Sequence, residues 1–116
     1  LRCSGSSGQL QQVVMNLVQN ACDALAGRQD PSLTVTGGVD GGMATLHFAD
    51  NGPGIPAEHL DHLFEPFFTT KPVGQGTGLG LSISYSIVDR HGGHLSVANR
   101  PQGGAEFTLT LPLESR

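Results

Sequence analysis

Apolar and polar residues follow two different periods along this chain, and the changes between them mark its elements. From Gln9 to Ala26, apolar residues recur every three or four positions, which predicts an amphipathic helix. The same period over Leu79–His91 predicts a second long helix, and a short helix is predicted over Ala57–Leu63. These three segments are the predicted helices of the chain.

Four other segments alternate between apolar and polar residues, as half-buried strands do. They are Leu33–Thr36, Thr45–Ala49, Leu95–Ala98 and Ala105–Leu111. Gly37–Gly42 joins the first two and Pro101–Gly104 joins the last two, which predicts two antiparallel hairpins. We therefore expect the α+β class: a two-layer α/β sandwich in which helices cover one face of a mixed, mostly antiparallel sheet.

Length and composition limit what this domain can be. With 116 residues, 17 of them glycine, the chain suffices for one domain with a modest core. Residues 1–8 are predicted to be a flexible start or a cloning remnant, and residues 9–116 the domain. A net charge of −4 is too mild for a nucleic-acid arm, and no apolar run is long enough for a membrane span. Cys22 is predicted to be a small core residue of the first helix.

A stripe of polar side chains accompanies the apolar face of the first helix. Asn16, Asn20 and Asp23 stand four and three residues apart, so they share one side of the helix. A solvated helix edge would explain them, although asparagine is a poor residue for a helix interior. The amide oxygen of Asn20 would also suit a hard cation such as Mg²⁺, so both interpretations stay open.

A second candidate is Asp50, which ends a predicted strand and opens the run Asp-Asn-Gly-Pro-Gly. Asn-Gly is a common turn dipeptide, so an ordinary turn is one interpretation. A carboxylate here would accept a hydrogen bond from an exocyclic amine, which adenine carries where guanine has a carbonyl. Gly52 and Gly54 would let a flat ring lie close to the backbone.

Alternating glycines from Gly74 to Gly80 lead directly into the second long helix. Backbone N–H groups at the start of a helix, together with the helix dipole, bind phosphate. The stretch lacks the Gly-Lys-Ser/Thr of a Walker loop, and no strand stands immediately before it as a dinucleotide fingerprint requires. It is therefore predicted to be a phosphate-binding loop of another kind.

Four stretches stand out together because of their order: Gln12–Ala24, Asp50–Pro56, Leu63–Lys71 and Gly76–Ile83. They resemble, in turn, the asparagine box, the first glycine box, the phenylalanine box and the second glycine box of the ATP-binding catalytic domain of two-component sensor histidine kinases. This domain belongs to the superfamily of gyrase, the ninety-kilodalton heat-shock chaperones and the MutL mismatch-repair ATPases. The resemblance covers roughly residues 9–113 and implies the Bergerat ATP-binding fold with a flexible lid.

The resemblance implies ATP and Mg²⁺ as cofactors and gives individual residues a role. Asn20 would bind the metal, and Asn16, Asn20 and Lys71 would be the catalytic residues. For Asp23, a contact with Lys71 or with the water around the metal, and a bare helix edge, stay open as alternatives. The nucleotide would contact Asn20, Asp23, Asp50, Gly52, Gly54, Ile55, Lys71, Gly76, Thr77, Gly78, Leu79 and Gly80. The lid would be anchored by Phe64, Phe67 and Phe68.

The resemblance also implies a protein histidine kinase. Related ATPases carry a glutamate four residues before the metal-binding asparagine, where this chain has Asn16, which cannot take a proton from water. The γ-phosphoryl group would pass to a histidine on a separate dimerisation and phosphoacceptor domain, because none of the five histidines here precedes an acidic residue. A related ATPase, an anti-sigma-type serine kinase and an ATP-binding module without turnover stay open as alternatives.

Partners and location follow from the same resemblance. We expect a response regulator receiver domain as a further partner, no nucleic acid, and a monomeric domain within a homodimeric full-length protein. The isolated fragment should bind ATP without phosphorylating itself. The domain is expected in the cytoplasm, and anchoring of the full-length protein in the bacterial inner membrane stays open.

Overall fold

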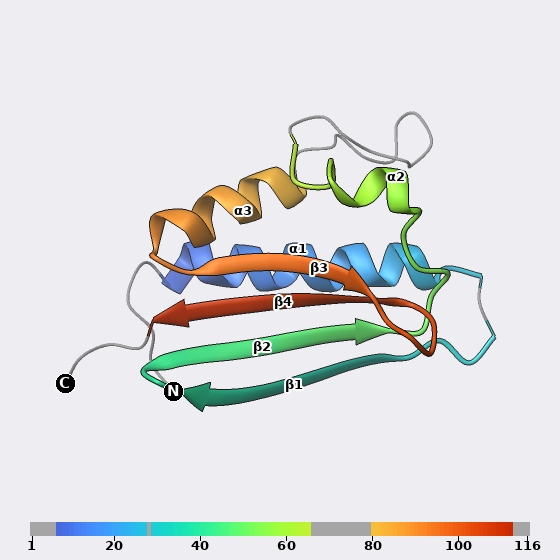
Figure 1. Ribbon diagram of the computed structural model, residues 1–116, viewed down its shortest axis with the longest axis horizontal. Coiled ribbons are helices and arrows are strands. Elements are labelled where there is room, and N and C mark those ends of the chain that lie inside the picture. The colour runs from blue at the N-terminus through green and yellow to red at the C-terminus, as the bar shows by residue number, and fades with distance from the viewer. Residues whose placement is uncertain (1–6, 28, 66–79, 113–116) are drawn as a thin grey trace.

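The computed structural model describes residues 7–27, 29–65 and 80–112. Its elements are α1 (Ser7–Leu25), β1 (Leu33–Asp40), β2 (Met43–Asp50), α2 (Ala57–Leu60), α3 (Gly80–Arg90), β3 (His94–Asn99) and β4 (Ala105–Pro112). One layer is a four-stranded sheet and the other holds α1 and α3 (Figure 1). This confirms the α+β sandwich, with every described strand pair antiparallel rather than mixed. Among the described residues no helix has the length and apolarity to cross a membrane.

The first hairpin is longer than the sequence predicts. β1 and β2 pair along their whole length, so that Gly37 lies opposite Leu46 and Gly38 opposite Thr45. The connection is only Gly41-Gly42, with φ values of 59° and 81°. A two-residue turn with positive φ at both positions matches the twist of paired strands. The predicted six-residue connection over 37–42 is therefore wrong.

The sheet has the strand order β1-β2-β4-β3. The two central strands, β2 and β4, come from different hairpins and pair over Met43–Ala49 and Glu106–Pro112. Figure 1 shows α1 and α3 side by side on one face of the sheet. On β4 the residues that point toward these helices are buried: Ala105, Phe107, Leu109 and Leu111. The pairing places the end of β2 beside the start of β4, where Asp50 is located.

The face of α1 that packs on the sheet is narrower than its apolar pattern indicates. Its fully or nearly buried residues follow each other at a spacing of four: Val13, Leu17, Ala21 and Leu25. Cys22 is exposed, because it lies about 100° around the helix from Ala21. Its predicted place in the core is therefore wrong, and Ala24 is exposed as well.

The ends of all three helices differ from those predicted. α1 begins at Ser7, so the helix includes two of the eight residues expected to form a flexible start. α2 ends at Leu60 instead of Leu63 and continues in hydrogen-bonded turns, in which the His62 amide donates to the His59 carbonyl at 3.0 Å. Helix α3 ends at Arg90 instead of His91, and its predicted start at Leu79 lies outside the described residues.

Candidate functional site

Asp50 is the last residue of β2 and is only 4% exposed. Its Oδ1 accepts hydrogen bonds from the backbone N–H of Gly52 at 2.8 Å and of Ala105 at 3.2 Å. No other described residue donates to the second oxygen, Oδ2. One oxygen therefore fixes the orientation of the carboxylate, and the other remains available to a donor from outside the chain.

Two glycines leave little or no space for a side chain near this carboxylate. A Cβ added to Gly52 would lie 3.0 Å from Asp50 Oδ1 and 3.4 Å from the Ala24 carbonyl oxygen. A Cβ on Gly104, where φ is 88°, would overlap the Asp50 carbonyl oxygen. These contacts bring the loop after β2, the C-terminal end of α1 and the turn between β3 and β4 together around Asp50.

The side of α1 that carries the polar stripe extends away from this loop. Ala24, Asn20 and Asn16 follow each other on this side at intervals of four residues, so each lies about 6 Å further along the helix axis at a rise of 1.5 Å per residue. Ala24, at the end near the loop, faces Gly52. At the other end, the Asn16 amide nitrogen donates to Ser84 Oγ at 3.1 Å and to the Gly80 carbonyl at 3.3 Å. The stripe thus connects the Asp50 loop with the start of α3.

The two asparagines of the stripe differ in what they bind. The Asn16 amide oxygen accepts a hydrogen bond from Gln12 Nε2 at 2.9 Å, and its nitrogen is held by α3, so both ends of the amide are engaged. Asn20 is half-buried and makes no side-chain hydrogen bond within the part of the chain that the structure describes. Asn20 is therefore the asparagine whose oxygen is available to a cation.

Asp23 lies on the exposed surface of α1 and accepts a hydrogen bond from Gln19 Nε2 at 3.0 Å. This contact is compatible with both interpretations of Asp23: a residue at the helix edge, or one that contacts Lys71 or the water around the metal. The predicted site residues Lys71, Gly76, Thr77, Gly78 and Leu79 lie outside the described residues, as do Phe67 and Phe68. Their roles stay predictions.

At the start of α3, Gly80 presents its backbone carbonyl to α1 and to its own helix. Besides Asn16, the hydroxyl of Ser84 donates to it at 2.9 Å. Ser84 is fully buried between the helices, and an added Cβ on Gly80 would meet no atom of the described residues within 4 Å. The end of the predicted phosphate loop is thus fixed on α1 by polar contacts.

Phe64 connects the segment after α2 with the body of the domain. Its ring lies 5.2 Å from the Tyr85 ring of α3 and 6.4 Å, edge to face, from the Phe107 ring of β4. Nearby, His62 Nδ1 lies 2.8 Å from Glu65 Oε2. The hydrogen bond and the negative charge of Glu65 raise the pKa of His62 above its usual 6.5.

Sequence analysis missed two residues of the site, Asn99 and Arg100, at the end of β3. Arg100 Nη1 donates to the Asp50 carbonyl at 2.7 Å. The Asn99 side chain donates to the Ile55 carbonyl at 2.7 Å and accepts from the Ile55 amide at 2.8 Å. Because these partners are 44 and 50 residues away in the chain, no local pattern signals them.

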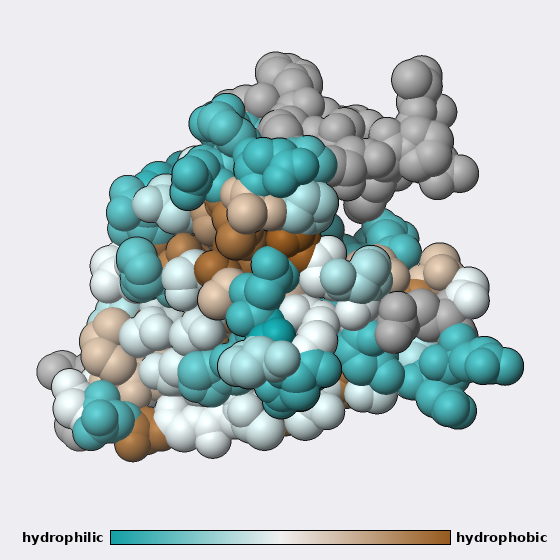
Figure 2. Space-filling view, turned by 45° about the vertical axis from the view of Figure 1, so that its right-hand side comes forward, coloured by the Kyte–Doolittle hydropathy of each residue, from teal (hydrophilic) through white to brown (hydrophobic). Residues whose placement is uncertain are grey.

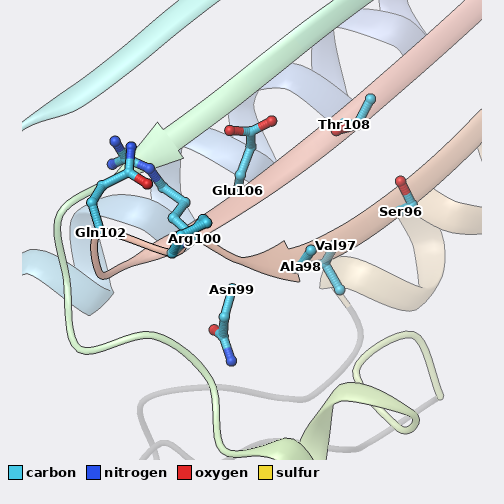
Figure 3. A pocket seen from close by; sticks show the side chains of 9 residues that line it. Ser96, Val97, Ala98, Asn99, Arg100, Gln102, Glu106 and Thr108 are labelled. Atoms are coloured by element: carbon cyan, nitrogen blue, oxygen red, sulfur yellow. The ribbon is translucent and has the colours of Figure 1, made fainter.

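Asn99 and Arg100 also border a cavity of about 220 Å³ (Figure 3). Its remaining lining is Ser96, Val97, Ala98, Pro101, Gln102, Glu106 and Thr108. In the space-filling view, apolar surface is recessed among hydrophilic residues on the side of the molecule turned to the viewer (Figure 2). Ile55, Leu63 and Phe64 are among the partly buried apolar residues that pack on the core.

Comparison with known protein sequences identifies sensor kinases as relatives of this chain. The family described as "Histidine kinase-, DNA gyrase B-, and HSP90-like ATPase" matches residues 5–115. The two-component sensor PprA of Pseudomonas aeruginosa is 46% identical over 114 residues, covering 94% of this chain and 12% of PprA. The sensor histidine kinase ZraS of Escherichia coli K12 is 42% identical over 105 residues, covering 90% of this chain and 22% of ZraS. The chain thus spans less than a quarter of these relatives.

Solved structures of histidine kinases are similar in fold to this chain. The mycobacterial sensor histidine kinase MprB superposes with a TM-score of 0.82 at 32% identity, covering 97% of this chain and 75% of that one. The nucleotide-free catalytic domain of the histidine kinase ThkA gives 0.79 at 38% identity, covering 91% and 67%. Full-length ShkA in complex with AMPPNP gives 0.78 at 30% identity, covering 94% and 22%.

Proposed function

Since the chain belongs to the histidine kinase-, DNA gyrase B- and HSP90-like ATPase family, as a sensor histidine kinase catalytic domain, we propose that it binds Mg·ATP and donates the γ-phosphoryl group to a histidine of a partner domain. The observation that carries the proposal is the half-satisfied carboxylate of Asp50. A buried acceptor with one oxygen held by two backbone amides and the other without a donor among the described residues suits a ligand that supplies an N–H.

Adenine would bind at the Asp50 end of the site. Its exocyclic amine would donate to Asp50 Oδ2, and the absence of side chains at Gly52 and Gly54 would let a flat ring lie close to the backbone. Guanine has a carbonyl oxygen at the same ring position, which the carboxylate would repel. Because a carboxylate can only accept hydrogen bonds, the fixed carboxylate of Asp50 would favour binding of adenine over guanine.

The phosphates would lie toward Asn20 and the start of α3, along the stripe of α1. Asn20 fits Mg²⁺ as a single protein oxygen ligand, because this ion commonly keeps several waters and takes its other ligands from substrate phosphates. When bound, the ion would neutralise phosphate charge. Lys71 and the glycines from Gly76 to Gly80 belong to the proposal as phosphate-binding residues, as the resemblance implies.

We propose phosphoryl transfer rather than hydrolysis because Asn16 stands where related ATPases carry the glutamate that takes a proton from water. The amide of Asn16 has no basic group, and its hydrogen bonds to α1 and α3 are already made. The residues of this chain would hold the nucleotide and shield its phosphates, and the attacking imidazole would come from the partner. The dimerisation and phosphoacceptor domain, the response regulator and a cytoplasmic location are parts of this proposal.

The test is to mix the chain with γ-³²P-ATP, Mg²⁺ and a phosphoacceptor domain from a sensor histidine kinase. We expect acid-labile, base-stable label on a histidine of that domain, little free phosphate, and no label on the chain alone. Free phosphate released in place of labelled protein would identify an ATPase, and label on a serine a serine kinase. Binding of ATP with neither product would identify a module without turnover.

A second experiment tests the place of the metal. Asn20→Ala should weaken the stimulation of ATP binding by Mg²⁺, measured by calorimetry at increasing Mg²⁺ concentration. Gln11→Ala is the matched control, because Gln11 is an exposed residue of the same helix that makes no side-chain hydrogen bond to a described residue. An unchanged Mg²⁺ titration in Asn20→Ala would remove Asn20 from the metal site.

A further inference from the structure

Two consecutive side chains at the end of β3 hold the loop after β2 at both of its ends. Arg100 binds the carbonyl of Asp50, where the loop begins, at 2.7 Å. Asn99 binds both the amide and the carbonyl of Ile55, five residues later, at 2.8 and 2.7 Å. In Figure 3, Asn99 lies inside the bend of the segment that leads from β2 to α2, and Arg100 extends toward the end of β2.

The turn that carries these side chains is itself fixed on the loop. The Arg100 amide donates to the Gly104 carbonyl at 2.9 Å, and the Gly103 amide donates to the Arg100 carbonyl at 3.0 Å. The residue after the turn, Ala105, donates its amide to Asp50 Oδ1 at 3.2 Å. The turn between β3 and β4 and the Asp50 loop therefore form one hydrogen-bonded unit, with Asp50 Oδ2 left over for a ligand.

Asn99 contributes a contact that few side chains could replace. It donates to and accepts from the same residue, as a backbone partner does in a sheet, and so fixes the backbone of Ile55 in position and orientation. The next residue, Pro56, precedes α2. Asn99 thus sets where the backbone leaves the Asp50 loop.

We infer that Asn99 is a positioning residue for base selection: by holding Ile55, it keeps the loop in the shape that presents Asp50 Oδ2 and the adjacent backbone to adenine. This inference rests on the proposed function of Asp50. Asn99 contacts the backbone of the loop that carries Asp50, so its effect would be on discrimination between bases as well as on affinity. Arg100 supports the same loop at its other end through the Asp50 carbonyl.

The test compares Asn99→Asp with Gln102→Glu. Both exchange an amide for a carboxylate, Asn99→Asp at the last residue of β3 and Gln102→Glu in the turn that follows, but Gln102 is exposed and makes no side-chain hydrogen bond to a described residue. Asn99→Asp keeps the acceptor for the Ile55 amide and places a negative oxygen beside the Ile55 carbonyl. Asn99→Ala, which removes both bonds without adding charge, is the second variant if Asn99→Asp fails to fold.

Each protein is titrated with ATP and with inosine triphosphate, which has a carbonyl in place of the exocyclic amine. We expect Asn99→Asp to weaken ATP binding by about tenfold and to lower the ATP-to-ITP affinity ratio, with Gln102→Glu like the wild type. Hydrogen exchange of the Ile55 amide, followed by NMR without nucleotide, should be faster in Asn99→Ala only.

Asp50→Asn distinguishes a failure of the proposed role of Asp50 from a failure of the proposed role of Asn99. If Asp50→Asn keeps the wild-type ATP-to-ITP ratio, the proposed function of Asp50 fails. If Asp50→Asn loses that ratio while Asn99→Asp and Asn99→Ala keep it, the proposed function stands and the role of Asn99 is overturned. An equal weakening of ATP and ITP in the Asn99 variants would make Asn99 a merely structural residue and would also overturn the inference.

Discussion

Gly103 and Gly104 form a natural pair of test positions, because they are adjacent and both have positive φ, 107° and 88°. They differ in their surroundings. An added Cβ on Gly103 would meet no atom of the part of the chain that the structure describes within 4 Å, whereas on Gly104 it would overlap the carbonyl oxygen of Asp50. Alanine at each position therefore has the same backbone strain, and only Gly104→Ala adds a collision with the proposed base-binding residue.

The size of each effect can be estimated. A Cβ in the left-handed region costs about 1–2 kcal/mol, which applies to both variants. Overpacking of a tight contact adds about 1–3 kcal/mol, which applies to Gly104→Ala alone. Since 1 kcal/mol corresponds to roughly 4 °C for a domain somewhat above 100 residues, Gly104→Ala should melt about 4–12 °C below Gly103→Ala.

The assay is thermal unfolding followed by circular dichroism, with ATP affinity measured on the same samples at 20 °C. We expect Gly103→Ala to bind ATP like the wild type and Gly104→Ala to bind it more weakly, because the displaced Asp50 backbone carries the carboxylate with it. Equal melting temperatures and equal affinities for the two variants would refute the close contact between the β3–β4 turn and Asp50.

Two other contacts make separate predictions. Glu65→Gln should lower the pKa of His62 toward its usual value in an NMR titration, because the raised pKa depends on Glu65. The contribution of this exposed pair to stability should be complete below pH 6.5 and lost as pH rises through the raised pKa, and an unchanged pKa in the variant would exclude the pairing. Phe64→Leu should lower the free energy of unfolding by about 1–3 kcal/mol in a urea titration, because both ring contacts, with Tyr85 and Phe107, are lost. An unchanged urea midpoint would mean that Phe64 does not anchor this segment.

The sequence predicted the layers of the fold because they depend on local periods. The helical and alternating patterns place each apolar residue on one face, and the structure confirms those elements with shifted ends. Gly37 and Gly38 were assigned to a connection on composition alone. The pairing with β2, which continues to Gly41-Gly42, keeps them in the strand, and such long pairing depends on the turn geometry at the far end.

The site was predictable where its chemistry lies in one continuous run. Asp50 and Gly52 are neighbours in the chain, so a turn that doubles as a carboxylate site can be read from five residues. The difference between Asn16 and Asn20 could not be predicted, because it depends on Ser84 and Gly80 of α3. Asn99 could not be predicted for the same reason, because Ile55, the residue that its side chain binds, is 44 residues away in the chain.

The central claim is that Asp50 Oδ2 accepts a hydrogen bond from the exocyclic amine of adenine. Calorimetric titration of the unmodified chain with ATP and then with ITP tests it most directly, because the two nucleotides differ in the base groups that meet this oxygen. A hydrogen bond to a charged group contributes about 1.5–3 kcal/mol, so ATP should bind about 10- to 150-fold more tightly than ITP. Equal affinities for ATP and ITP would contradict the account.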